Sequence, residues 1–74
     1  MRISAGALDI DRFRAFVLSR GATLERARPA AGEVLRFRID LARGIVARRK
    51  NGTFTLITMA VDLYREFKGH PHAQ

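Results

Sequence analysis

The stretch EVLRFRIDLARGIVARRKNGTFTLI, residues 33–57, decides the fold. At its start, Leu35, Phe37 and Ile39 alternate with charged or smaller neighbours. A period of two is typical of a strand with one buried face. Two further β-type runs follow after short connections, over 44–50 and 53–57. The stretch therefore predicts a three-stranded antiparallel meander.

The second connection of this meander lies within RRKNGTF, residues 48–54. Asn51-Gly52 is a favoured pair for a two-residue type I′ turn, because both central residues of that turn need positive φ. A two-residue loop pairs Arg48 with Thr55 and Lys50 with Thr53. We therefore expect Arg48 and Lys50 to lie on one face of the sheet.

The first connection, DLARG over 40–44, is predicted to be an odd-length loop with Gly44 as a bulge. Ile39 then lies opposite Ile45, and the strand residues Leu35, Phe37 and Ile39 share the core face with Ile45. The other face is predicted to be open and basic. Its members are Val34, Arg36, Arg38, Val46, Arg48, Lys50, Thr53, Thr55 and Ile57.

One helix is predicted before the meander in the chain, and another after it. Asp9 or Asp11 can cap a helix over 10–20, whose apolar residues recur at helical spacing. Thr58 can cap a second helix, which Gly69 and Pro71 end. Residues 24–28 are a candidate short edge strand, and residues 1–8 and 69–74 are predicted to be flexible termini.

The expected fold class is α+β in a single domain over residues 1–74, with the element order α-β-β-β-α. Both helices are expected to cover the same apolar sheet face, because the strands offer only one.

Composition restricts the function classes. The chain has 14 basic and 7 acidic residues and a net charge of +7, which favours polyanionic partners. It has no cysteine, so disulfides and thiolate metal sites are excluded. No apolar run reaches the length of a membrane span. These features predict a cytoplasmic protein without a cofactor.

No catalytic constellation is apparent in the sequence. The two histidines, His70 and His72, lie in the predicted C-terminal tail, where HPH offers two metal ligands at best. Every aromatic residue falls on a face predicted to be core, whereas base-stacking platforms need exposed rings. We therefore expect a protein that is not an enzyme. If it binds nucleic acid, we expect it to contact the backbone of a duplex.

The segment EVLRFRIDLARGIVARRKNGTFTLITMAVDLYREFKG, residues 33–69, resembles small uncharacterised proteins encoded by phages, prophages and plasmids. The resemblance covers about half the chain and implies no active residues. It implies proteins that act on host systems by binding a protein or a nucleic acid. The α-β-β-β-α order is also similar to the double-stranded-RNA-binding fold, but the Lys-rich helix start of that family is missing here.

Two functions remain open from the sequence. The first is nucleic-acid binding, with phosphate contacts and a shaped hairpin tip from Arg36, Arg38, Arg48, Arg49, Lys50, Asn51 and Gly52. The second is a protein-binding module, an inhibitor or adaptor of a host complex, through an apolar patch of Val34, Val46 and Ile57. A homodimer is compatible with both. The sequence does not distinguish DNA, RNA and an acidic protein surface as the ligand.

Overall fold

The computed structural model describes residues 1–69, so the predictions for His70, His72 and the rest of the tail lie outside the described residues. The chain order is β1 (Arg2–Gly6), α1 (Ile10–Ser19), β2 (Thr23–Glu25), η1 (Pro29–Ala31), β3 (Glu33–Ile39), β4 (Ala42–Arg48), β5 (Phe54–Thr58) and α2 (Val61–Gly69). Here η1 is a single 3₁₀ turn. The fold is α+β, as expected.

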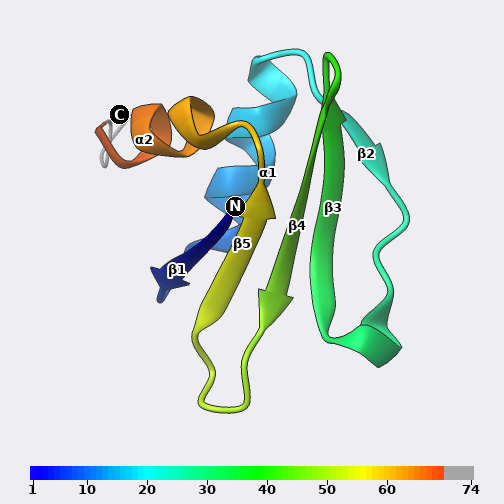
Figure 1. The fold of residues 1–74 in the computed structure, drawn as a ribbon, viewed down its shortest axis with the longest axis vertical. Coiled ribbons are helices and arrows are strands. Elements are labelled where there is room, and N and C mark those ends of the chain that lie inside the picture. Colours follow the sequence, from blue (N-terminus) through cyan, green and yellow to red (C-terminus); the bar gives the residue numbers. More distant parts are fainter. Residues whose placement is uncertain (70–74) are drawn as a thin grey trace.

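The five strands form one antiparallel sheet in the order β1-β5-β4-β3-β2 (Figure 1). The predicted meander is its centre, but the three-strand count was wrong. The candidate strand over 24–28 overlaps β2 only at its first two residues, since β2 ends at Glu25. β1 lies within the segment predicted to be a flexible terminus. Ile3 and Ala5 of β1 are partly buried and pack against the core, while Arg2 and Ser4 are exposed. This alternation is short, so it gave only a weak strand signal.

The core lies between one face of the sheet and the two helices. α1 contributes Phe13 and Val17, both fully buried, and α2 contributes Tyr64 and Phe67. The Phe13 ring makes edge-to-face contacts with Phe37, Tyr64 and Phe67, at centroid distances of 5.8, 6.3 and 5.0 Å. Such contacts add to the apolar burial. They join both helices to β3, and within residues 1–69 no helix lies over the opposite sheet face.

The β3–β4 register differs from the prediction. Phe37 lies opposite Gly44 and Ile39 opposite Ala42, so the hairpin closes with a two-residue turn, Asp40-Leu41. Asp40 has a φ of 53°, as a tight hairpin turn requires. A Cβ on Gly44 would lie 2.2 Å from Cζ of Phe37. Gly44 is therefore not a bulge in the connection: it makes room for the Phe37 ring.

The β4–β5 register is also shifted by one residue from the prediction. Val46 lies opposite Leu56, and Arg48 lies opposite Phe54. A shift of one residue moves every side chain of a strand to the other face. Val46 is consequently buried in the core, whereas Ile45 and Ala47 lie on the open face and are partly exposed.

Candidate nucleic-acid interface

The loop between β4 and β5 is a three-residue connection. The amide of Arg49 donates to the Thr53 carbonyl at 2.7 Å, and the amide of Gly52 donates to the Arg49 carbonyl at 3.0 Å. Gly52 has a φ of 87°, while Asn51 is not in the positive-φ region. The pattern is that of a type I turn followed by a left-handed residue, so the predicted type I′ turn was wrong.

The side chain of Asn51 explains this turn. Its Oδ1 accepts hydrogen bonds from the Thr53 amide at 3.0 Å and from the Thr53 hydroxyl at 2.6 Å. An Asn that bonds two residues ahead replaces a backbone turn with its own side chain. The tip is thus held by four hydrogen bonds, and Asn51 and Gly52 shape it as expected, although through a different geometry.

Arg48 lies at the end of β4, but not on the open face where the sequence placed it. Because it lies opposite Phe54, its side chain is on the helix-covered face, with the guanidinium carbon 5.4 Å from the centroid of the Phe54 ring. Its amide donates to the Gly32 carbonyl at 2.8 Å. That bond ties the end of β4 to the turn that begins at Arg28.

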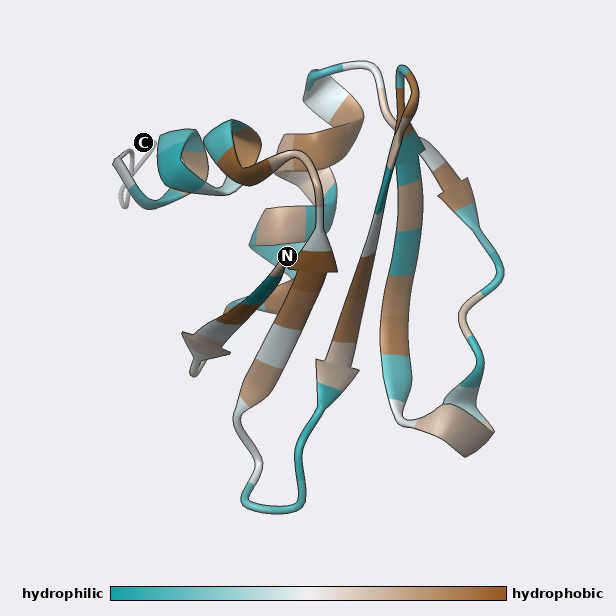
Figure 2. Ribbon diagram, viewed as in Figure 1, coloured by the Kyte–Doolittle hydropathy of each residue, from teal (hydrophilic) through white to brown (hydrophobic). Residues whose placement is uncertain are grey.

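Four exposed cations therefore gather at one end of the sheet, which we call the basic end: Arg28, Arg48, Arg49 and Lys50. Figure 1 shows η1 and the β4–β5 loop at this end, and Figure 2 shows the loop as hydrophilic. Within residues 1–69, none of these four side chains forms an ion pair with a carboxylate. The sequence pattern did not indicate Arg28, because only the turn over 28–33 brings it to this end.

The two cations predicted on β3, Arg36 and Arg38, do lie on the open face, but each interacts with an acidic side chain. Arg36 binds Glu33 through two hydrogen bonds, Nε to Oε1 at 3.2 Å and Nη2 to Oε2 at 2.9 Å. These side chains are 16% and 10% exposed. The hydrogen bond from Arg36 is the main reason that the pKa of Glu33 lies below its ordinary value. The same bond is the main reason that the pKa of Arg36 is raised. Arg38 Nε lies 3.9 Å from Oε2 of Glu25.

The open face also carries cations that the sequence pattern did not place there. Arg43 lies opposite Arg38, and Arg2 lies opposite Ile57 on the edge strand. Neither Arg2 nor Arg43 has an acidic partner within the described part of the chain. The open face is therefore mixed in sign and not uniformly basic as predicted.

The apolar patch predicted for protein binding, Val34, Val46 and Ile57, is not the patch that the structure shows. Val46 has no exposed surface, so it does not belong to a surface patch. Ile57 remains partly exposed on the open face, where Ile45 lies directly opposite it. Val34 is also partly exposed, but it packs against the core. The sequence pattern placed Ile45 in the core because the register predicted for β4 against β5 was shifted by one residue from the observed one.

Residues 1–69 contain neither a metal-binding group of side chains nor a helix that could span a membrane. No three His, Cys, Asp or Glu side chains come together there in a way that would hold a metal ion. Neither helix in that range has the length and hydropathy needed to span a bilayer.

Comparisons with protein-family models, with curated proteins and with solved structures found no match to this chain. Its function is therefore inferred from its own residues.

Proposed function

We propose that this chain is a small, non-catalytic nucleic-acid-binding domain that contacts the phosphate backbone of a duplex through its basic end. One observation carries the proposal: four exposed cations, none of which forms an ion pair with a carboxylate of residues 1–69, lie at one end of the sheet, on a hydrogen-bonded hairpin tip and the adjoining turn. Guanidinium and ammonium groups of this kind bind phosphate oxygens and fix the position of a protein on a duplex.

The proposal moves the contact from the open face to the basic end. Arg36 and Arg38 already interact with acids, so a phosphate would have to displace Glu33 and Glu25 to reach them. Arg49 and Lys50 have no such competitor within the described residues. The aromatic residues support duplex binding over single strands, because five of the six are buried and the sixth, Phe16, is partly buried and packs against the core.

The test is a titration of labelled duplex DNA and duplex RNA at two salt concentrations. We expect non-specific affinity in the range of about 10⁻⁴ to 10⁻⁶ M at physiological salt, rising steeply as salt is lowered. Arg49→Gln/Lys50→Gln removes two charges at the tip. It should weaken binding at every sequence tested and reduce the salt slope by about two.

The matched control is Arg2→Gln/Arg43→Gln, which removes the same two charges from the open face. It should weaken binding less than the tip variant does. Equal losses would mean that net charge alone attracts the nucleic acid, and a greater loss in the control would move the site to the open face. No binding of the parent at low salt would overturn the proposal.

A second candidate, protein binding through the open face, is favoured by the direct pairing of Ile45 with Ile57, both partly exposed there. In this case the chain would act as an adaptor or inhibitor of the phage-encoded type. Ile57→Asp would then abolish partner capture, while the tip variant would leave it intact.

A further inference from the structure

Two large apolar side chains are exposed at the end of the sheet opposite the basic end. Leu41 is fully exposed at the β3–β4 turn, and Met59, between β5 and α2, is 79% exposed. Neighbouring strands bring them together, because Gly44 lies opposite Thr58. We call this surface, made of Leu41, Ala42, Met59 and Ala60, the apolar end.

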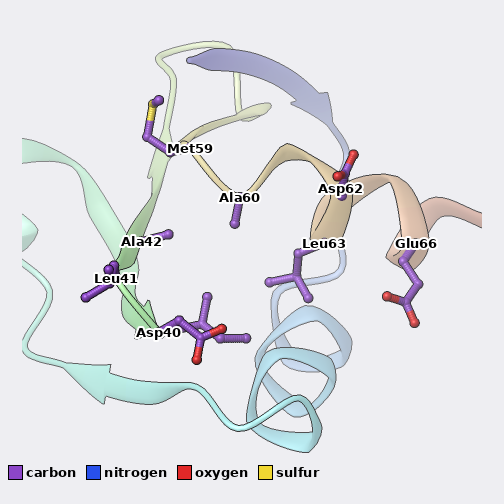
Figure 3. Close-up of a pocket in the computed structure, with 9 residues that line it drawn as sticks. Asp40, Leu41, Ala42, Met59, Ala60, Asp62, Leu63 and Glu66 are labelled. Atoms are coloured by element: carbon purple, nitrogen blue, oxygen red, sulfur yellow. The ribbon is translucent and has the colours of Figure 1, made fainter.

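The apolar end separates two hollows. The one on the helix side has a volume of about 480 Å³ and is lined by Ile39, Leu63 and the apolar end itself, with Asp40, Asp62 and Glu66 at its rim. Figure 3 shows Ala60 and Leu63 pointing into it, while Leu41 and Met59 point outward. The other hollow, of about 390 Å³, opens beside Ile45 and Ile57. Protruding side chains and apolar hollows thus lie side by side on one surface.

The charges beside the apolar end are of both signs. Asp40 and Arg43 flank Leu41 and Ala42 in the chain, and neither has an oppositely charged partner within residues 1–69. The other two acids of the rim are already engaged, Asp62 by Arg65 and Glu66 by Arg20. Asp40 is therefore available beside two cations, Arg43 and the ammonium group of Met1, whose nitrogen lies 3.7 Å from Sδ of Met59. A surface that carries charges of both signs suits neither a polyanion nor a strongly basic peptide. It suits a second copy of the same surface.

We propose that two copies of this chain associate through their apolar ends about a two-fold axis. Leu41 and Met59 of each copy then lie in the hollows of the other, and Asp40 of each copy pairs with Arg43 of the other. A two-fold interface requires such a self-complementary surface, since each contact occurs twice. The proposal does not depend on nucleic-acid binding, and it leaves both basic ends exposed.

The association is expected to be weak. The molecule measures 29 × 25 × 21 Å, so one end offers less area than the roughly 800 Å² per partner of a standard stable interface. Sedimentation equilibrium without nucleic acid, from about 10 µM to about 1 mM, covers the range expected for such an interface. The parent mass should rise from 8.3 kDa towards twice that value.

Leu41→Asp should lower the association constant at least about tenfold, because each dimer then buries two carboxylates in apolar hollows. Leu41 is exposed, so the fold should be unaffected, which far-UV circular dichroism checks. A parent that stays at 8.3 kDa at every concentration, or a variant that associates as the parent does, overturns the proposal.

A charge exchange tests the pairing itself. Asp40→Lys and Arg43→Asp should each weaken self-association, because like charges then meet across the axis, but an equimolar mixture of the two should form a heterodimer. Asp40→Asn removes the charge while keeping a residue that tolerates positive φ. It should also weaken association.

Arg49→Asp is the matched control, since it makes the charge change of Arg43→Asp at the other end of the molecule. It should associate as the parent does. If the mixture shows no more association than its separate components, or if the control weakens association as much as Arg43→Asp, the proposed pairing is wrong.

Discussion

The two hairpins of this chain share strand β4, yet different features set their geometry. The β4–β5 hairpin contains Asn-Gly, a strong turn signal, but closes with three loop residues. The β3–β4 hairpin has no glycine in its turn and closes tightly through Asp40-Leu41. The comparison shows that core packing, through Phe37 over Gly44 and the burial of Val46, outweighs local turn preference in setting the register.

The largest expected effect tests which face of β4 is inward. Val46→Asp should reduce the free energy of unfolding by about 4 kcal/mol, because it buries an unpaired carboxylate. The adjacent Ile45→Asp lies on the open face and should lose only about 1 kcal/mol. Urea denaturation followed by circular dichroism measures both. An equal or greater loss at Ile45 would contradict the register with Val46 inward.

The next effect concerns the glycine that accommodates Phe37. Gly44→Ala should lower stability by about 2–3 kcal/mol, because the new methyl group would overlap the ring. Phe37→Leu in the same chain should recover part of this loss. Gly69→Ala is the control, since a Cβ there would meet no atom within 4 Å and the φ of Gly69 is not positive. If Gly44→Ala costs no more than this control, the ring does not set the register.

The third test compares the two turns, which should respond with opposite signs. Gly52→Ala places a side chain in the left-handed region and should cost about 1 kcal/mol. Asp40→Gly removes left-handed strain of about 1–2 kcal/mol and adds about 0.5–1 kcal/mol of chain entropy, a net gain of about 0.5 kcal/mol. Thermal denaturation of both variants measures the signs. A gain for Gly52→Ala would contradict the left-handed residue that ends the three-residue loop.

The smallest effect is on the acid dependence of stability at the start of β3, where Glu33 lies opposite Ala47. The folded pKa of Glu33 is below its ordinary value of 4.5, so the carboxylate contributes stability above that pH and loses it as the pH falls through the lowered pKa. Stability should therefore decline as the pH falls below 4.5 and through the lowered pKa, and Glu33→Gln should flatten this decline.

Arg36→Gln should flatten it as well, because the hydrogen bond from Arg36 is the main cause of the shift. An unchanged decline in both variants would mean that the pair does not couple to folding.

Much of the candidate site was accessible from the sequence. The cations Arg48, Arg49 and Lys50 are adjacent in the chain, so any hairpin there brings them together. Arg28 was not accessible, because the turn over 28–33 and a hydrogen bond from Arg48 to Gly32 bring it to the same end. The ion pair between Arg38 and Glu25 was missed for a similar reason, since it depends on the pairing of β2 with β3.

The sequence by itself determined the local elements: a helix over 10–20, which the structure has as Ile10–Ser19, and the period-two pattern of β3 with Leu35, Phe37 and Ile39 inward. It also determined that the aromatic residues lie on the core side, where all but the partly buried Phe16 are buried. These follow from periodicities that a short window contains. Only the tertiary structure decided the register of β4 and the recruitment of β1 and β2 to the edges. Both faces of β4 offer apolar residues, so alternation alone does not choose between them. The choice came from fitting the Phe37 ring over Gly44 and Val46 beneath the helices, contacts between segments that no local pattern specifies.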